Sequence, residues 1–346
     1  MKNFFKLFQR KVHFPLIQSK PINPLIKAMT LEEKVSFCRG ASYFQTVSIP
    51  RLNIPRMQMS DGPCGVNKAG LFNDELFTNR DSKSTVLFPC PCCSSCSFDQ
   101  DLLFLLGQTV GEEMVKEGVS LILSPAVNIK RSPLCGRNFE YFSEDPFLSS
   151  KIASSFIQGV QSKGVGCCIK HFAAYNQETV RFHYSSDVDE RTFREIYLTS
   201  FEYAIKEAKP WAVMSSYNKI NGSYAANDYN LLTGILRNEW NWLIDDENGQ
   251  KIEGFVVSDW DGQHDRIEGF KAGLDLKMPG PNQFNCHETD DKKIIESVRN
   301  KVISEDLIDR SAERILNIVL KAQNLIKKSE SDSSIQFGVT ISKVEG

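Results

Sequence analysis

The chain has 346 residues, with 41 basic and 43 acidic side chains and a formal net charge of -2. This near balance gives no electrostatic reason to expect nucleic acid or an anionic membrane as a partner, so a neutral ligand fits better. The length suits one large α/β domain with terminal extensions. No apolar run approaches the roughly 20 residues needed to cross a bilayer, so no membrane span is expected.

The N-terminal segment is basic, because residues 1–28 contain several lysines and an arginine but no acidic residue. We expect an N-terminal basic extension over 1–28, with an organelle-targeting segment as the open alternative. No convincing signal peptide is visible, which favours the cytoplasm.

The ten cysteines are expected to be reduced thiols, since the chain is long and shows no clear export signal. Four of them cluster at Cys90, Cys92, Cys93 and Cys96. Their spacing does not repeat the paired Cys-x-x-Cys knuckles of zinc sites. Because cysteine is small and readily buried, we expect these thiols in the core, with a metal or redox module as the weaker alternative.

The predicted elements alternate between strands and helices, which indicates βαβ units around a parallel sheet. A helix begins at the capping box of Thr30 and Glu33, within 29–39. After residue 326 the chain turns polar and serine-rich, so we expect a linker or tail over 326–346. The predicted strands are 119–124, 165–170, 211–216 and 254–258; the predicted helices are 101–117, 146–162, 190–207, 229–240, 291–302 and 305–325.

Residues capable of chemistry follow several predicted strands directly. They are the pairs Lys170-His171, Tyr217-Asn218 and Asp259-Trp260. In barrels and open α/β sheets the loops at the carboxyl ends of strands converge, so sites are built there. The pattern therefore predicts a site at this edge of the sheet.

Asp259 is the central candidate, because it ends an apolar strand. A carboxylate at such a position is a nucleophile, a metal ligand or a structural cap. The cations Arg137, Lys170 and Arg181, with His171, are expected to lower its pKa and keep it ionised. Charged groups of this kind also bind sugar hydroxyls. The candidates for binding sugar hydroxyls are Asp61, Arg137, Lys170 and His171. The flat faces of Tyr217 and Trp260 are candidates for packing against a pyranose ring.

Several long segments together resemble one known family. They include SDGPCGV (60–66), NIKRSPLCGRNFEYFSEDP (128–146), GVGCCIKHFAAYNQET (164–179), GFVVSDWDG (254–262) and AGLDLKMPGP (272–281). In collinear order, from about residue 25 to residue 325, they are similar to the N-terminal domain of glycoside hydrolase family 3 β-glucosidases. The resemblance implies an α/β fold, a TIM-like (β/α)8 barrel over 29–325, with an irregular first strand as an open variant.

The resemblance also implies roles for single residues. Asp259 would be the nucleophile of a retaining β-glycosidase that hydrolyses terminal non-reducing β-D-glucosyl residues through a covalent glycosyl intermediate. Asp61, Arg137 and the pair Lys170-His171 would bind the sugar. Arg181 and Tyr217 would lie beside the nucleophile, and Trp260 on the leaving-group side. No metal and no organic cofactor are implied, and the expected partner is a β-glucoside or related oligosaccharide.

The acid/base group is not identified in these 346 residues. In the branch that the chain resembles, this group is a glutamate of a C-terminal α/β-sandwich domain, so a separate domain or a homo-oligomer partner is an expected complement. Another branch uses a His-Asp pair on the loop after Lys-His-Phe, where this chain reads AAYNQET (173–179). The alternative function is therefore a barrel fragment or pseudoenzyme that binds sugar without efficient turnover.

The chain departs from the family at two further places. Residues 90–96 read CPCCSSC where the family usually has alanines and threonine, and a polar insert lies at 245–249. We expect the thiols to pack as small core residues and the insert to form a surface turn.

Overall fold

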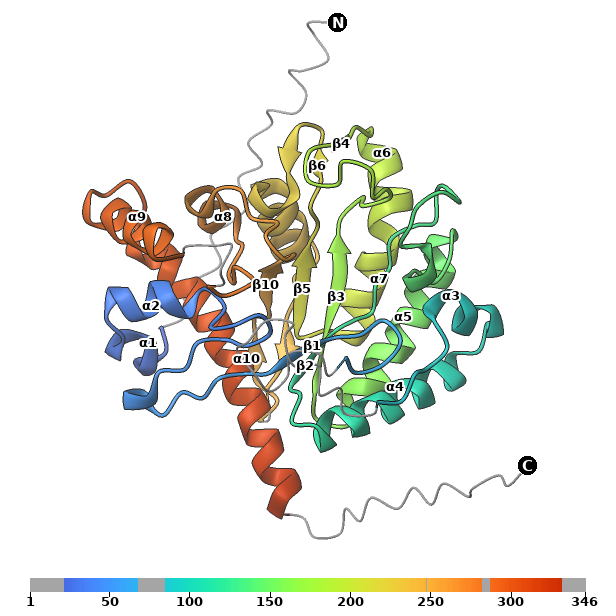
Figure 1. Ribbon diagram of the computed structural model, residues 1–346, viewed down its shortest axis with the longest axis horizontal. Coiled ribbons are helices and arrows are strands. Elements are labelled where there is room, and N and C mark those ends of the chain that lie inside the picture. Colours follow the sequence, from blue (N-terminus) through green and yellow to red (C-terminus); the bar gives the residue numbers. More distant parts are fainter. Residues whose placement is uncertain (1–21, 68–84, 247, 282–286, 332–346) are drawn as a thin grey trace, which may run out of the picture.

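The fold is built on a parallel β-sheet, in the computed structural model that describes residues 22–67, 85–246, 248–281 and 287–331. Five strands lie side by side in the order β1-β2-β3-β5-β10, and every neighbouring pair is parallel. Helices connect and cover them, and Figure 1 shows the strands at the centre of the molecule. The predicted α/β class with a parallel sheet is confirmed.

The strands and helices have the following bounds. The central strands are β1 (Met59–Asp61), β2 (Leu121–Leu123), β3 (Gly166–Phe172), β5 (Ala212–Ser215) and β10 (Phe255–Ser258). The short strands are β4 (Ser185–Ser186), β6 (Lys219–Ile220), β7 (Ser223–Tyr224), β8 (Ile244–Asp245) and β9 (Lys251–Ile252). The α-helices are α1 (Pro24–Ala28), α2 (Leu31–Phe37), α3 (Pro91–Ser94), α4 (Gln100–Lys116), α5 (Pro146–Gln161), α6 (Glu190–Thr192), α7 (Thr199–Ala208), α8 (Arg266–Ala272), α9 (His287–Arg299) and α10 (Glu305–Ser331). The other helical turns are η2 (Pro50–Leu52), η3 (Ser95–Ser97), η4 (Asn138–Glu140), η5 (Phe193–Leu198), η6 (Ala225–Asn227) and η7 (Asn230–Glu239).

Single bridges extend the sheet beyond its last strand. Val257 of β10 pairs in parallel with Leu276, and the adjacent Lys277 pairs in parallel with Arg39. Antiparallel bridges then connect this segment to Gln58, which directly precedes β1. The described residues thus form a five-stranded parallel sheet with a partial return toward its first edge, and they do not show the closed eight-stranded barrel.

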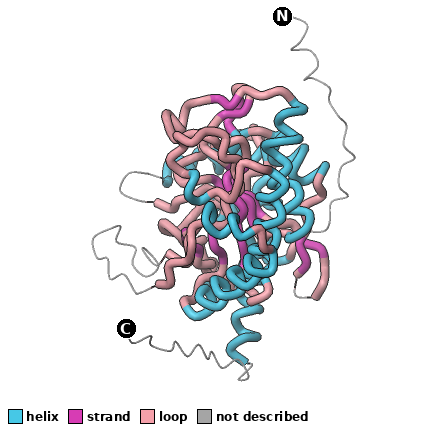
Figure 2. The backbone as a smooth tube through the Cα atoms, turned by 90° about the vertical axis from the view of Figure 1, so that its right-hand side faces the viewer, coloured by secondary structure: helices cyan, strands magenta, loops and turns pink. Residues whose placement is uncertain are grey.

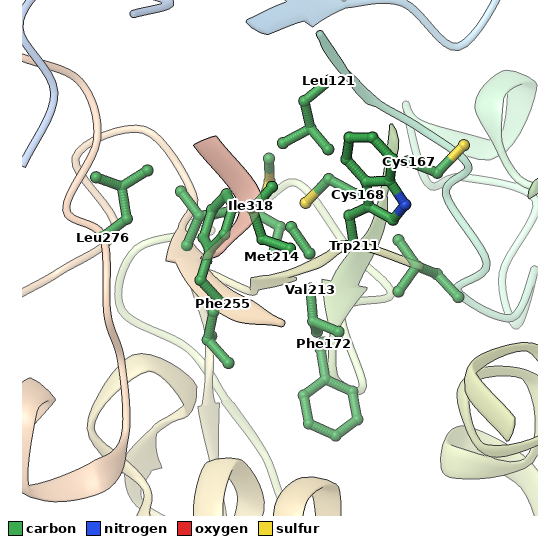
Figure 3. Packing of buried hydrophobic residues seen from close by; sticks show 14 of the residues in the cluster. Leu121, Cys167, Cys168, Phe172, Trp211, Val213, Met214, Phe255, Leu276 and Ile318 are labelled. Carbon is green, nitrogen blue, oxygen red and sulfur yellow. The ribbon is translucent and has the colours of Figure 1, made fainter. Parts of the chain in front are cut away.

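The core lies between the sheet and the helices around it. Helix α4 packs on α5 and α5 on α7, while α10 runs past β10 (Figure 1). In the view of Figure 2 some strand segments lie at the centre, with helices and loops around them, and others lie at the top and at the lower right. Figure 3 shows buried side chains from four strands and α10 in this core, including Leu121, Cys168, Phe172, Met214, Phe255 and Ile318. Burial of such side chains contributes roughly 1.5–3 kcal/mol each relative to exposure.

Local signals in the sequence explain where several helices begin. Thr30 accepts from the Glu33 backbone and the Glu33 side chain accepts from Thr30, so the predicted capping box is present at α2. Asp145 caps α5 by accepting from Leu148, ahead of a proline in the first turn. The helix predicted at 190–207 forms as α6, η5 and α7, in which η5 is π-helical.

The helical structure extends further toward both ends of the chain than the predicted boundaries of the N-terminal extension and the C-terminal tail. Residues 22–28, predicted within the basic extension, include helix α1, whose Ile26 is fully buried. The backbone N–H of Asn23 donates to Glu313 of α10, so this segment is held against the domain. Residues 1–21 lie outside the described part. At the other end α10 continues to Ser331, and residues 332–346 of the predicted tail also lie outside it.

Within the described ranges, the helices are all too short or too polar to cross a membrane.

Candidate active site

Polar side chains from five neighbouring strands, or from the loops that follow them, lie at one edge of the sheet. Asp61 is the last residue of β1, and Lys170 and His171 lie near the end of β3. Asp259 directly follows β10. Arg137 comes from the loop after β2, and Tyr217 from the turn after β5. Because the strands are parallel, these positions share the carboxyl edge, as the sequence predicts.

Asp61 and Lys170 form an ion pair across the first three strands. The Lys170 Nζ donates to Asp61 Oδ1 at 2.8 Å, and the backbone N–H of Gly62 donates to the same oxygen at 3.1 Å. Burial acts to raise the pKa of Asp61, but Lys170, Arg137 and the Gly62 N–H together outweigh it, so the pKa is lowered. The Lys170 side chain is 3% exposed and that of Asp61 is 45% exposed. Asp61 therefore offers an ionised, accessible carboxylate from a fixed position.

Arg137 is held by groups on both of its sides. Its Nε donates to Glu140, which is buried, and its Nη2 lies 2.8 Å from His171 Nε2. The guanidinium also lies 5.6 Å from the ring centre of Tyr175. These contacts fix the cation beside the histidine.

His171 is a neutral ring, because burial lowers its pKa well below the ordinary value and Arg137 lowers it further. A guanidinium can only donate, so Nε2 of His171 accepts and Nδ1 carries the proton. Asn128 fixes the backbone: its amide donates to the His171 carbonyl at 2.9 Å and accepts from the His171 N–H at 2.8 Å. The protonated Nδ1 is buried without a hydrogen-bond partner among the described residues.

The Asp259 carboxylate is almost fully buried, with 9% of its side chain exposed. Its Oδ1 accepts from the Trp260 backbone N–H at 2.8 Å, and its Oδ2 lies 3.7 Å from His171 Nε2. Oδ2 accepts no hydrogen bond of normal geometry from the described residues. Buried polar atoms are rarely left unpaired, and a catalytic role is one explanation for those that are.

Burial raises the pKa of Asp259, and Arg137, Lys170 and the Tyr217 hydroxyl counteract this only in part. The sequence-based expectation of a lowered pKa is therefore wrong in its net direction. The cations act as predicted, but the cost of desolvating a nearly buried carboxylate is larger.

Tyr217 lies beside Asp259, and Arg181 contacts the ring of Tyr217. Burial raises the pKa of the Tyr217 phenol and the Asp259 charge raises it further, so the phenol stays protonated. The Arg181 guanidinium lies 4.7 Å from the Tyr217 ring centre and donates to Glu178 at 3.2 Å. Phe182 packs edge-on against Tyr217 at 4.6 Å. Arg181 thus approaches the nucleophile candidate through the ring of Tyr217.

Trp260 occupies the other side of Asp259 and is held by a distant segment. Its indole N–H donates to the Tyr43 carbonyl at 2.9 Å, and its ring lies 5.5 Å from that of Phe44. Burial raises the pKa of the Tyr43 phenol, with contributions from the Asp261, Asp61 and Asp259 charges. Tyr43 therefore belongs to the same group of side chains.

All eight predicted side chains are linked in one group, but sequence reasoning missed four of their supports. These are Tyr43, Asn128, Glu140 and Tyr175. Only Glu140 had a usable local signal, its three-residue spacing from Arg137. Tyr43 and Asn128 contact partners far along the chain, which no local pattern predicts, and Tyr175 contacts both His171, four residues before it, and the distant Arg137.

The cysteine cluster does not pack as predicted. Cys93 and Cys96 are exposed, and Cys90 and Cys92 are half-buried. The reason is that residues 90–97 form two short helical turns at the surface, α3 and η3. Over the described ranges, no group of three or more His, Cys, Asp or Glu side chains could hold a metal ion.

Comparison with known proteins decides the family. Residues 77–318 match the profile of the glycosyl hydrolase family 3 N-terminal domain. This chain belongs to glycoside hydrolase family 3. Most of the described site lies inside the matched range, whereas Asp61 and Tyr43 precede it.

Other family 3 members are similar in sequence and structure. The chain is 48% identical over 301 residues to thermostable beta-glucosidase B of Acetivibrio thermocellus, covering 87% of this chain and 38% of that protein. It is 40% identical over 305 residues to an exo-alpha-(1->6)-L-arabinopyranosidase of Bifidobacterium longum, covering 88% and 38%. Beta-glucosidase 3B of Thermotoga neapolitana, solved in complex with glucose, superposes with a TM-score of 0.77 at 39% identity, covering 88% and 43%. The chain thus spans well under half the length of these relatives.

Proposed function

We propose that this chain is the nucleophile-bearing domain of a retaining β-glycosidase that hydrolyses terminal non-reducing β-D-glucosyl residues. The observation that carries the proposal is the buried Asp259 carboxylate, whose Oδ2 accepts no hydrogen bond of normal geometry from the described residues and lies near fixed polar side chains. A nucleophile needs a free oxygen, and a sugar needs several oriented donors and acceptors. Asp61, Lys170, Arg137 and His171 supply the latter.

In the proposed reaction Asp259 Oδ2 attacks the anomeric carbon, and the bond to the leaving-group oxygen breaks. A covalent glycosyl-Asp259 ester forms, which water then hydrolyses with net retention. The Tyr217 phenol and the Arg137 and Lys170 cations stabilise the carboxylate both before attack and as it departs. The acid/base carboxyl that retaining hydrolysis requires is assigned to a glutamate of a further domain, as in the relatives that the sequence resembles.

The substrate assignment rests on the names of the relatives. One is a β-glucosidase and another an arabinopyranosidase, and both are at least 40% identical to this chain. We assign glucose first, because the similar Thermotoga neapolitana structure was solved with glucose bound. Comparing aryl β-D-glucoside with aryl α-L-arabinopyranoside turnover tests this choice; faster turnover of the pentoside would reverse it.

A mechanism-based fluoro-sugar tests the nucleophile directly. An activated fluoroglucoside with a good leaving group needs little acid assistance, so it should label the chain at Asp259. Mass spectrometry of the digested protein locates the adduct. Asp259→Asn should prevent labelling, and Asp187→Asn, at an exposed aspartate, is the matched control. A folded wild-type protein that acquires no label at Asp259 contradicts the proposal.

The second candidate is a domain that binds sugar without efficient turnover, favoured by the absence of an assigned acid/base group. Calorimetric titration with glucose and turnover of a natural β-linked disaccharide separate the two. Binding without turnover supports this candidate, and turnover of the disaccharide by the chain removes it.

We also propose that the sheet belongs to a TIM-like (β/α)8-type barrel covering residues 29–325. The parallel bridges from β10 through Leu276 and Lys277 to Arg39 support this, since they continue the sheet in the direction that closure requires.

A further inference from the structure

Two thiols meet at the start of helix α3. Cys90 Sγ and Cys92 Sγ lie 3.3 Å apart, and both side chains are half-buried. Cys90 is the N-cap residue in an extended conformation, and Pro91 begins the helix. The turn between them brings the two sulfur atoms to the same side. Neither the proposed hydrolysis nor the core uses this pair.

The surroundings distinguish this pair from the other cysteines. Cys38, Cys167 and Cys168 are fully buried, so a dissolved disulfide does not reach them. Cys93 and Cys96 are exposed, and neither contacts a second thiol within hydrogen-bonding distance in the described structure. Among the described cysteines, only the 90–92 pair combines solvent access with a sulfur-to-sulfur contact. Cys64 lies close enough for its pKa to respond to both thiols.

We propose that Cys90 and Cys92 form a redox-active dithiol that a low-molecular-weight disulfide oxidises to an intramolecular disulfide. One thiolate attacks a sulfur of the small disulfide, whose S–S bond breaks and releases one thiolate. The second cysteine thiolate then attacks the mixed disulfide and releases the other half. The protein loses two electrons and two protons, and the small disulfide becomes two thiols. A closure of roughly 1 Å brings the sulfur atoms to bonding distance.

The dithiol lies between two loops that carry site residues. The Phe88 backbone N–H donates to the Cys64 carbonyl at 3.0 Å, which links the segment before α3 to the loop after Asp61. Ser95 donates to the Phe142 carbonyl at 2.6 Å, which links the segment after α3 to the loop that carries Arg137. Helix α3 also packs on η4, which contains Glu140. Rotating the first turn of α3 to close a disulfide therefore disturbs both loops.

Oxidation should for this reason weaken glucose binding, an expectation that rests on the proposed function. The disulfide itself does not depend on that function. The two parts therefore have separate readouts, and failure of one does not imply failure of the other.

The first experiment equilibrates the reduced chain with mixtures of glutathione and glutathione disulfide. Peptide mapping after alkylation should show a 90–92 disulfide, with the loss of two free thiols, that dithiothreitol reverses. Cys90→Ser and Cys92→Ser should each abolish it, whereas the matched control with Cys93→Ser and Cys96→Ser should retain it. Glutathione attached only to Cys93 or Cys96, or a disulfide that omits Cys90 or Cys92, overturns the inference.

A second probe requires no substitution. Phenylarsine oxide binds two neighbouring thiols with loss of water, so one equivalent should protect Cys90 and Cys92 of the wild-type chain from alkylation. Protection of neither contradicts the inference even if a serine variant fails to fold.

Calorimetry with glucose then tests the coupling. The oxidised wild-type chain should bind more weakly than the reduced chain, and the Cys92→Ser variant should bind equally under both conditions. Equal affinity of a chain shown to carry the disulfide overturns the coupling alone. Failure of the reduced chain to bind glucose counts against the proposed function and leaves the dithiol unaffected.

Discussion

At the scale of single residues, the site balances two opposed effects on one carboxylate. Burial raises the pKa of Asp259, while Arg137 and Lys170 lower it. A more exposed carboxylate would be ionised more easily, but water would solvate and weaken it as a nucleophile. Because its pKa is raised, Asp259 becomes protonated, and loses its reactive ionised form, at a higher pH than an ordinary aspartate does.

Lys170→Met should therefore move the acidic limit of the reaction upward. Removing the cation lets burial raise the pKa of Asp259 further, so the ionised fraction falls at a higher pH. We expect the acidic limb of the pH profile for labelling by the fluoro-sugar to shift toward higher pH. The position of the limb is the readout, because loss of Lys170 also weakens binding and lowers the rate at every pH.

Lys151→Met provides the comparison, since Lys151 pairs with Glu207 on the outer helices. It should leave the limb in place. A Lys170→Met profile that coincides with the wild-type profile would show that another group sets the acidic limit.

The residues that carry charge at the strand ends could be predicted from sequence, but their supports could not. Lys170, His171 and Asp259 follow apolar runs, a pattern that local reading detects. Asn128 could not be predicted because its role is two hydrogen bonds to the backbone of His171, a partner 43 residues away. The net pKa of Asp259 was missed for a similar reason, since burial depends on the assembled structure.

At the scale of elements, a buried carboxylate joins helix α10 to the sheet. Asp275 accepts from Arg237 of η7 at 2.6 Å, from Arg314 of α10 at 3.0 Å and from the Val256 backbone of β10 at 2.8 Å. Its side chain has no exposed surface. One residue thus fixes the positions of three elements around the strand that ends at Asp259.

Asp275→Ala should be strongly destabilising. It removes the carboxylate that pairs with Arg237 and leaves Arg314 with Glu253 alone, and breaking a buried pair from one side costs about 3–5 kcal/mol. Urea unfolding measures the change. Glu202→Gln, at an exposed pair with Lys206 on α7, should change the free energy of unfolding by less than about 0.5 kcal/mol. Similar values for both variants would mean that the Asp275 network contributes little.

Glu253 makes the same junction sensitive to acid. Burial acts to raise its pKa, but Arg314 and Arg237 lower it from an ordinary value of 4.5 to about 2. A lowered folded-state pKa contributes stability that is present above the ordinary value and is lost as the pH falls toward 2. The urea midpoint should therefore fall less steeply between these pH values in Glu253→Gln than in the wild-type chain. Parallel curves would exclude Glu253 as a source of the acid sensitivity.

Helix and strand positions followed from periodicity, whereas their internal geometry did not. The helix predicted at 190–207 contains the π-helical turn η5, and the one predicted at 229–240 forms as the π-helical η7. An apolar stripe at three- and four-residue spacing does not distinguish a widened turn from a regular one. At 90–96, the tendency of cysteine to be buried predicted core packing, but Pro91 begins a surface turn that exposes Cys93 and Cys96.

At the scale of the whole molecule, the strand order brings side chains from separate sequence motifs together in one site. Asp61 of β1 and Asp259 after β10 come from the two ends of the five-stranded order. Lys170 and His171 of β3, between them, contact both: Lys170 donates to Asp61, and His171 lies 3.7 Å from Asp259. The α/β class could be predicted from alternating elements, but the bridges that return from β10 toward β1 involve single residue pairs with no periodic signal.

Because the site spans the whole sheet, a bound sugar should stabilise the whole domain. A ligand that binds only the folded chain adds about 2.7 kcal/mol at a concentration of one hundred times its Kd. Saturating glucose should therefore raise the Tm by several degrees in a calorimetric scan, and Asp61→Ala should remove most of the rise. The Glu202→Gln variant should retain it. This result is expected whether or not the chain turns over a glycoside, because it depends only on binding. The fluoro-sugar could label Asp259 of a wild-type chain whose Tm glucose leaves unchanged. That result would mean that the chain's interactions with the sugar stabilise the transition state and not the ground state.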